Sequence, residues 1–317
     1  MKGKLFGILL WIGFIAISVY AVYPFFMDSL LGIDYVTTIG AYDKAISAKS
    51  STEIDAMWNA AWEYNKKIEQ KQKKHAYAYM GADATDEEYE SLLAPDGNTV
   101  MGSVQVPSVG IDLPIAHGTA NEQLDIEAGH IYGTSLPVGG AGSHAVIAGH
   151  TGLRNADIFT NLEKVKEGDY FYVSILNKKL AYKITRILVV LPEDEGPYLQ
   201  VETGRDLVTL YTCTPYGVNS HRLLIMGERD EEMERKDSVN QSNGIEVSRR
   251  DTAALIRCIG FGAIPFVVAI VAWFLVFGGK RKKKKQPDSA ADAMPPVPVP
   301  EIPPDSADDW FCTMDKR

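Results

Sequence analysis

The chain has 317 residues and a formal net charge of −9 at pH 7, with 41 acidic residues against 32 Lys and Arg. Apart from one short cationic run, it carries no basic stripe of the kind that binds nucleic acid, which argues against that class of protein. The region between two uncharged apolar segments is long enough for one sizeable domain with helical appendages.

The first element is an uncharged apolar segment over residues 5–27, preceded by Lys2 and Lys4. Its length matches the roughly 20 residues that a helix needs to cross a bilayer. A cleaved signal peptide is the alternative, but its apolar core is usually only about 7–15 residues long, and no clean small-x-small cleavage site follows here. We therefore predict a cytoplasmic stub and transmembrane anchor over residues 1–28.

Residues 29–99 are predicted to form an extracellular helical region. Two capping signals mark helix starts, each a hydroxyl residue followed three positions later by a glutamate: Ser50 with Glu53, and Thr85 with Glu88. The first opens a stretch with apolar residues at helical spacing, so we expect a helix over 50–74. The second predicts a short helix that ends near Leu93.

From Val100 onward the apolar pattern changes to a period of two, which is typical of β-strands. At least seven short strands are expected, separated by Gly, Pro, Asn and Asp turns: 104–107, 145–148, 170–173, 180–184, 187–190, 209–212 and 223–226. Short strands with no long helix between them predict a mainly β domain over 100–229, either an antiparallel barrel or a sandwich.

The C-terminal part begins with a charged, Ser- and Asn-rich tether over 230–257. Residues 258–279 form a second uncharged apolar segment, followed by six consecutive Lys and Arg residues. Cations directly after such a span indicate a cytoplasmic end, so both termini are expected in the cytoplasm and the central domain outside. The cytoplasmic region, 280–317, combines this basic cluster with a Pro-rich tail that is expected to be disordered.

The segment most informative about chemistry surrounds Cys213. Alternation over 209–212 predicts a strand that delivers Cys213 to its end, a turn around Pro215 follows, and 223–226 predicts the return strand. This hairpin would bring the thiol of Cys213 close to the guanidinium of Arg222. A thiolate beside a fixed positive charge is the arrangement that makes a cysteine nucleophilic near neutral pH.

The alternative is that Cys213 is a small core hydrophobe and Arg222 a surface ion-pair partner, since free cysteine is among the most buried residue types. The other two cysteines, Cys258 and Cys312, lie in an apolar segment and in the polar tail, so neither is expected near Cys213. An unpaired cysteine in an extracytoplasmic domain is a candidate reactive group.

A cysteine nucleophile needs a proton partner, and histidine is the usual one. Of the six histidines, His75 lies in a charged helical region and His221 points to the opposite face from Arg222; His117, His130 and His144 lie in Gly-rich loops. His150 follows the expected strand 145–148, at a strand end within a turn. Residue chemistry alone leaves it one candidate among several, and no short His/Cys spacing supports a zinc site.

Four segments together resemble the class C, pilin-polymerising sortases of Gram-positive bacteria: 111–115 (IDLPI), 129–140 (GHIYGTSLPVGG), 148–153 (AGHTGL) and 209–225 (TLYTCTPYGVNSHRLLI), the last followed by Gly227 and Arg229. The resemblance extends over about residues 100–229, and the two-span topology agrees with it. It implies a closed sortase-type β-barrel of about eight strands with N-terminal helices, flanked by two transmembrane helices.

The resemblance also implies a catalytic triad, with Cys213 as nucleophile, His150 as general acid/base and Arg222 as oxyanion stabiliser. The implied reaction cleaves an LPXTG-like sorting signal between Thr and Gly through a thioacyl-enzyme, which a pilin lysine then resolves. A sortase that attaches surface proteins to a cell-wall precursor amine is the alternative, and a non-enzymatic membrane-tethered binding domain is a further one. No metal or organic cofactor is required.

Two further sets of residues follow from the resemblance and from position. Thr212 and Thr214 flank the nucleophile and are candidates either for substrate binding or for completing the strand. Class C enzymes usually carry a lid anchored by an Asp-Pro-aromatic motif, which is absent between His75 and Val100. If a lid exists, Asp83 with Tyr77 or Tyr79 would have to anchor it.

Overall fold

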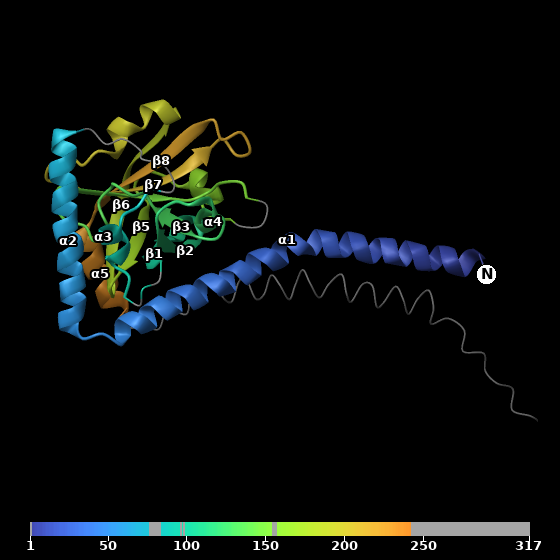
Figure 1. Ribbon diagram of the computed structural model, residues 1–317. Coiled ribbons are helices and arrows are strands. Elements are labelled where there is room, and N and C mark those ends of the chain that lie inside the picture. Colours follow the sequence, from blue (N-terminus) through green and yellow to red (C-terminus); the bar gives the residue numbers. More distant parts are fainter. Residues whose placement is uncertain (1, 76–83, 96, 98, 154–156, 242–317) are drawn as a thin grey trace, which may run out of the picture. The chain divides into compact units, whose positions relative to one another are not determined.

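The computed structural model describes residues 2–75, 84–95, 97, 99–153 and 157–241, and its centre is a closed barrel of eight strands in the order β1-β2-β3-β4-β7-β8-β6-β5 (Figure 1). The strands are β1 (Val100–Val106), β2 (Ile111–His117), β3 (Ala128–His130), β4 (Ser143–Ala148), β5 (Tyr170–Ile175), β6 (Lys178–Val190), β7 (Asp206–Thr214) and β8 (His221–Arg229). The expectation of a mainly β barrel is therefore confirmed.

The barrel differs from a purely antiparallel one in two places. β2 pairs with β3 in parallel, and β4 pairs with β7 in parallel. The connection from β4 to β7 carries β5, β6 and three short 3-10 helices, η2 (Thr160–Lys164), η3 (Pro192–Asp194) and η4 (Gly196–Leu199). A parallel pair needs such a crossover connection, whereas the β7–β8 hairpin closes directly as expected from its turn residues.

The strand pattern was predicted with two kinds of error. The segments 180–184 and 187–190 were expected as separate strands but form the single strand β6, in which the register to β8 shifts between Ile184 and Arg186. The shift changes the side-chain alternation and makes one strand look like two. β2 and β3 were not predicted as strands, and β3 is only three residues long.

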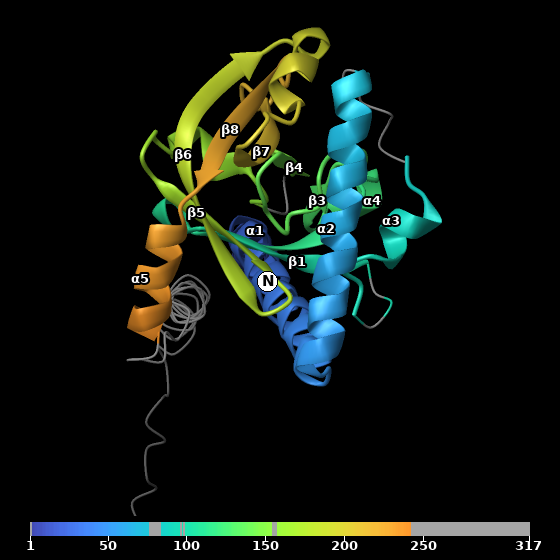
Figure 2. The ribbon, with the colours of Figure 1, turned by 90° about the vertical axis from the view of Figure 1, so that its left-hand side faces the viewer.

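Alternation along β4, β7 and β8 gives this part of the barrel two apolar faces. Val208, Leu210 and Ile225 point into the main core inside the barrel. On the opposite face a second cluster gathers Val146, Ala148, Leu188, Val190, Tyr198, Leu199, Tyr211 and Leu224. Leu199 belongs to η4, so the η3–η4 connection covers this outer face near one end of β6, β7 and β8 (Figure 2).

The helix α2 (Ser51–Lys74) begins at the predicted capping box, in which Ser50 and Glu53 bond each other's backbone N–H groups. It is joined to the barrel by buried amides, because the Asn65 side chain donates to the carbonyl of Leu136 at 2.9 Å and accepts from its N–H at 2.7 Å. The preceding helix, α1 (Lys2–Ser47), contributes Tyr42, whose hydroxyl donates to the Met101 carbonyl at 2.7 Å.

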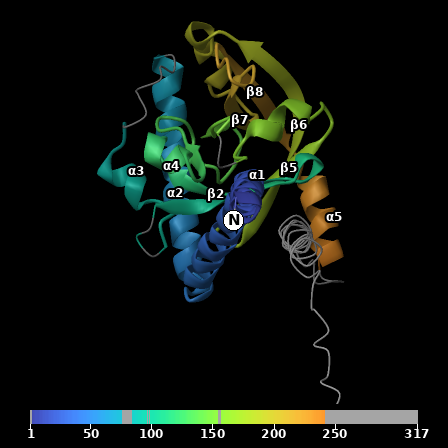
Figure 3. The same ribbon diagram turned by 90° about the vertical axis from the view of Figure 1, so that its right-hand side faces the viewer.

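The short helix α3 (Glu87–Ser91) starts one residue later than predicted. Its cap is Asp86, which accepts from the Tyr89 N–H at 2.7 Å, while the Thr85 hydroxyl donates to Glu90 instead. The fully buried hydroxyl of Tyr89 joins this segment to the barrel, since it contacts Nδ1 of His130 at 2.9 Å. The other short helix, α4 (Asn121–Leu124), contacts β3 (Figure 1). Figure 3 shows α4 from the side opposite to the view of Figure 2.

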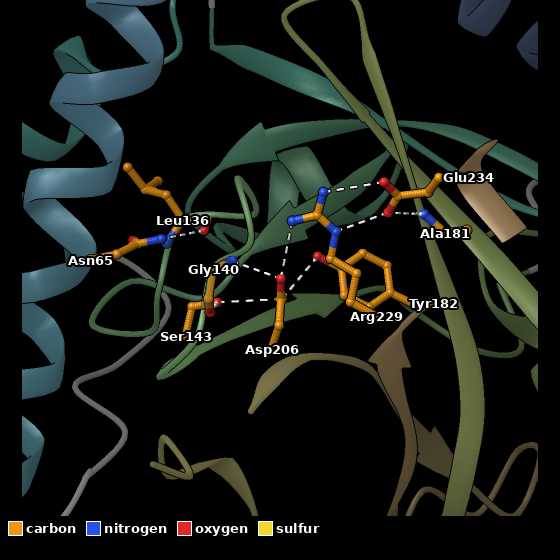
Figure 4. A network of polar contacts seen from close by, with 9 residues as sticks. All are labelled: Asn65, Leu136, Gly140, Ser143, Ala181, Tyr182, Asp206, Arg229 and Glu234. Carbon is orange, nitrogen blue, oxygen red and sulfur yellow. Dashed lines mark hydrogen bonds and ion pairs between the residues drawn. The ribbon is translucent and has the colours of Figure 1, made fainter. Parts of the chain in front are cut away.

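The first part of the predicted tether is a helix, α5 (Glu231–Gln241), fixed to the barrel by a polar network (Figure 4). Glu234 of α5 accepts from Arg229 Nε at 2.9 Å and from the Ala181 N–H at 3.0 Å. Arg229 also donates to Asp206, which in addition accepts from the Gly140 N–H and the Tyr182 hydroxyl. The network therefore holds the ends of β7 and β8 that lie away from Cys213.

None of the helices within the described residues combines the length and the apolarity that crossing a bilayer requires. The second predicted span, 258–279, and the tail, 280–317, lie outside the described residues.

Candidate active site

Cys213 and Arg222 are direct partners across the β7–β8 hairpin. Residues opposite each other in an antiparallel pair project from the same face, so the thiol and the guanidinium share one face. Tyr211 and Leu224, the next pair on this face, belong to the outer apolar cluster. Cys213 is a free, half-buried thiol at the edge of that cluster.

His150 reaches the same place from β4, the other neighbour of β7. The register pairs Ala148 with Tyr211, and the Gly149 N–H extends it by donating to the Tyr211 carbonyl at 3.0 Å. β4 ends at Ala148, and continuing this register by two residues would align His150 with Cys213. The imidazole is about one-third exposed, with 32% of the side chain accessible, so it can meet a substrate.

Backbone contacts on both sides fix the position of His150. The Thr212 hydroxyl donates to the Gly149 carbonyl at 2.7 Å, and the Phe159 N–H donates to the His150 carbonyl at 2.9 Å. A carboxylate also lies nearby, since Nε2 of His150 is 4.0 Å from Oδ1 of Asp125. Asp125 is well exposed, so we expect this contact to be weak in water.

Hydrogen bonds to one side chain and to two backbone carbonyls hold the side chain of Arg222. Its Nε–H donates to the Tyr211 hydroxyl at 2.8 Å, and Nη1 lies 3.3 Å from the carbonyl oxygens of Asn219 and His221. The Tyr211 hydroxyl donates in turn to Glu195 Oε2 at 2.8 Å. Burial opposes the charge of Arg222, but the electrostatic influence of Tyr211, Cys213 and Glu195 outweighs it and raises the pKa of Arg222.

The remaining described histidines have structural contacts or lie in exposed positions. His117, His130 and His144 are buried, and each has a ring nitrogen within hydrogen-bond distance of a backbone carbonyl. Burial lowers the pKa of all three, that of His130 to about 4. A buried, neutral imidazole that is hydrogen-bonded within the protein is not accessible to a substrate, so the geometry favours His150 among the candidate histidines.

The two threonines beside the nucleophile have their hydroxyls engaged within the protein. Thr212 bonds Gly149, and Thr214 donates to Glu163 Oε1 at 2.6 Å. Both side chains are buried on the face opposite Cys213. These contacts favour a structural contribution, while substrate binding by either residue stays a prediction.

The candidate lid residues Tyr77, Tyr79 and Asp83 lie outside the described residues. The sequence did not lead us to predict two residues that lie close to Arg222, namely Tyr211 and Glu195. Alternation along β7 places Tyr211 on the face of Cys213 and could have indicated it. Glu195 lies in the η3–η4 connection, where no periodic pattern points to a partner.

Chemically, the site joins a thiol, an imidazole and a guanidinium at the adjacent ends of three strands. A thiolate can attack a carbonyl carbon, a guanidinium can donate to the oxyanion that forms, and an imidazole can pass a proton to the leaving group. This set is suited to acyl transfer through a covalent intermediate. Within the described residues, no group of three or more His, Cys, Asp or Glu side chains is placed to hold a metal ion.

Comparison with known proteins gives consistent matches. A family model described as "Sortase domain" matches residues 104–230. The crystal structure of sortase C1 from Streptococcus agalactiae is 38% identical, with a TM-score of 0.57, over 61% of this chain and 98% of that one. Sortase C-1 from Actinomyces oris is 43% identical, with a TM-score of 0.51, over 56% of this chain and 98% of that one.

A curated relative, Sortase A of Streptococcus agalactiae serotype III, is 31% identical over 162 residues. That match covers 47% of this chain and 63% of the relative, so the chain spans a little under two thirds of the relative's length.

Proposed function

The chain belongs to the class C sortases, a family of cysteine transpeptidases, and we propose that it joins surface proteins by cleaving an LPXTG-like sorting signal and transferring the product to an amine. One observation carries the proposal. Cys213 stands opposite Arg222 on one face, and His150 comes to the same place from the neighbouring strand. A binding domain without enzymatic activity has no need for these three groups at one spot.

In the first step, the thiolate of Cys213 attacks the carbonyl carbon of the Thr–Gly peptide bond. The carbonyl oxygen becomes an oxyanion, to which Arg222 donates from N–H groups that the protein already holds in place. Such preorganised donors typically contribute about 3–4 kcal/mol to transition-state stabilisation. Collapse of the intermediate breaks the C–N bond, and His150 gives its proton to the departing glycine amine.

In the second step, the acceptor amine attacks the thioester carbon. The imidazole of His150, now neutral, removes a proton from the attacking nitrogen, and Arg222 again donates to the oxyanion. Collapse of this intermediate expels the Cys213 thiolate and leaves a new amide bond. The same three groups therefore serve both steps, with the imidazole returned to its starting protonation state.

We propose a pilin lysine as the acceptor, so that the product is a covalently joined pilus. The sequence supports this through the motifs shared with pilin-polymerising sortases, and a structural neighbour at 38% identity is described as sortase C1 of a pilus island of GBS. Attachment to a cell-wall precursor amine is the alternative. It uses the same three groups and differs only in the nucleophile.

We also propose that the catalytic domain is tethered outside the cell membrane by two spans, with both chain ends in the cytoplasm. The support comes from the sequence, in the uncharged segments 5–27 and 258–279 and the six cations over 280–285; among the described residues, no helix meets the length and apolarity of a span. Protease added to intact protoplasts should remove the central domain and spare an epitope placed after Arg317. Loss of that epitope from intact protoplasts would contradict the placement.

The function is tested by incubating the full-length chain with a sorting-signal peptide and a choice of amines. A peptide containing the lysine segment of a pilin should appear in the product joined to the threonine carbonyl, as identified by mass spectrometry. Transfer to a cell-wall precursor amine in preference to the lysine would favour the alternative. Absence of cleavage with every sorting-signal peptide would refute the sortase proposal for this chain.

A further inference from the structure

A chain of two hydrogen bonds leads away from the guanidinium of Arg222. Its Nε–H lies 2.8 Å from the Tyr211 hydroxyl, and that hydroxyl lies 2.8 Å from Oε2 of Glu195. A guanidinium can only donate and an ionised carboxylate can only accept. The hydroxyl must therefore accept from Arg222 and donate to Glu195, which fixes the direction of the Tyr211 O–H bond.

These contacts occupy two of the three nitrogens of the guanidinium. Nε is bound by Tyr211, and Nη1 lies within 3.3 Å of two backbone carbonyls, those of Asn219 and His221. Nη2 makes no hydrogen bond with the part of the chain that the structure describes. Because Arg222 stands opposite Cys213, the unoccupied N–H groups remain available beside the thiol.

The burial of Glu195 needs an explanation of its own. It is a carboxylate in a 3-10 connection with only 9% of its surface exposed, and burial raises its pKa. A charge is costly to bury unless it is hydrogen-bonded and paired. Tyr211 supplies the hydrogen bond and Arg222, one bond further, supplies the opposite charge. The carboxylate therefore belongs to the site of Arg222 and not to the surface.

The geometry points to Tyr211 and Glu195 as positioning residues for the proposed transpeptidation: they hold the plane of the Arg222 guanidinium so that its free N–H groups face the oxyanion formed at Cys213. This inference rests on the proposed function. Neither residue touches the reacting atoms. Their contribution is to fix in advance the direction of donors that a long, flexible side chain would otherwise present in many orientations.

The first test is Tyr211→Phe, which removes the hydroxyl and keeps the ring in the outer apolar cluster. Tyr198→Phe is the matched control, because Tyr198 packs against the same cluster and its hydroxyl makes no hydrogen bond with the described residues. For cleavage of a sorting-signal peptide by the full-length chain, kcat should fall by about ten- to a hundredfold in Tyr211→Phe, with KM changed by less than about twofold. Wild-type kcat in Tyr211→Phe would overturn the inference.

Glu195→Gln should lower kcat by a smaller factor, because a neutral amide can still accept from Tyr211 but no longer balances the charge. The exposed Glu193 in the same connection supplies the control, Glu193→Gln. A loss in Glu195→Gln that appears in KM and not in kcat would contradict a role expressed in the transition state.

Hydrogen exchange of the Arg222 side chain, measured by NMR, tests the inference without any substrate. The Nε–H resonance of Arg222, assigned through its loss in Arg222→Lys, should exchange slowly with solvent in the wild type and at least about tenfold faster in Tyr211→Phe. Equal exchange in both proteins would refute the restraint. If the wild type processes no sorting-signal peptide, the proposed function fails, whereas this measurement still shows whether Tyr211 restrains Arg222.

Discussion

Gly149→Ala is expected to disturb the position of His150 through packing alone. A Cβ at residue 149 would lie 2.7 Å from Cδ2 and 2.8 Å from Cγ of Phe159, and 2.9 Å from Cγ2 of Ile158. Phe159 and Ile158 are completely buried. Rotation of the ring about the Cβ–Cγ bond leaves Cγ in place, and the complete burial of Phe159 leaves the ring no other position. The backbone at 149–150 or at 158–159 must therefore move.

The cost follows from the size of this overlap. An ordinary carbon–carbon contact is about 3.5–4.0 Å, so the atoms must separate by roughly 1 Å. Overpacking of this kind typically costs about 1–3 kcal/mol, which in a domain of this size lowers Tm by about 2–12 °C. The Phe159 N–H also bonds the His150 carbonyl, so the same movement displaces the imidazole from Cys213. A displacement of about 1 Å can lower the rate about a hundredfold.

Thermal unfolding and steady-state cleavage of a sorting-signal peptide measure the two effects. The matched control is Gly40→Ala in α1, where an added Cβ meets no atom within 4 Å. Gly149→Ala combined with Phe159→Ala, which removes both Cγ and the ring, should recover part of the lost kcat. Wild-type Tm and kcat in Gly149→Ala would refute the claim that close packing behind Gly149 positions His150.

Three other outcomes are expected. Arg222→Lys should lower kcat by at least about a hundredfold, since an ammonium cannot reproduce the fork of donors; kinetics within tenfold of wild type would contradict this. Burial lowers the pKa of His130 to about 4 from an ordinary value of 6.5. As the pH falls between these two values, the unfolded chain binds a proton at His130 and the folded chain does not, so the free energy of unfolding should fall by up to about 3 kcal/mol. Urea unfolding measured as a function of pH should show a weaker pH dependence in His130→Asn, and an unchanged pH dependence would disprove the assignment. Glu234→Ala should lower the free energy of unfolding by about 1–3 kcal/mol, because Arg229 and the Ala181 N–H lose a partly buried partner, whereas Lys236→Ala, which breaks an exposed pair on the same helix, should leave it unchanged.

The sequence was most informative where structure depends on near neighbours. The capping box of Ser50 and Glu53 and the hairpin that pairs Cys213 with Arg222 are both local, and both are present. That the side chains of Cys213 and Arg222 share one face is shown by the observed register of the hairpin. The closed barrel followed from the family resemblance, since the periodicity alone left a sandwich as an alternative.

The contacts that complete the site were harder to predict because they join distant segments. The parallel pairing of β4 with β7 brings His150 to Cys213, and no local pattern encodes a parallel pair with two intervening strands. Glu195 reaches Tyr211 through an irregular 3-10 connection that lacks any periodic signal. β3, with three residues, is too short for alternation to be recognised.

The most direct test of the central claim is the intact mass of the full-length chain after mixing with a sorting-signal peptide in the absence of an acceptor amine. The account predicts a mass gain equal to the peptide fragment ending in threonine, released by hydroxylamine and mapped to Cys213 by digestion. In Cys213→Ala the gain should be absent while Tm stays within a few degrees of wild type. Cleavage of the peptide by that variant at the wild-type rate, or an acyl group on another residue, would contradict the account.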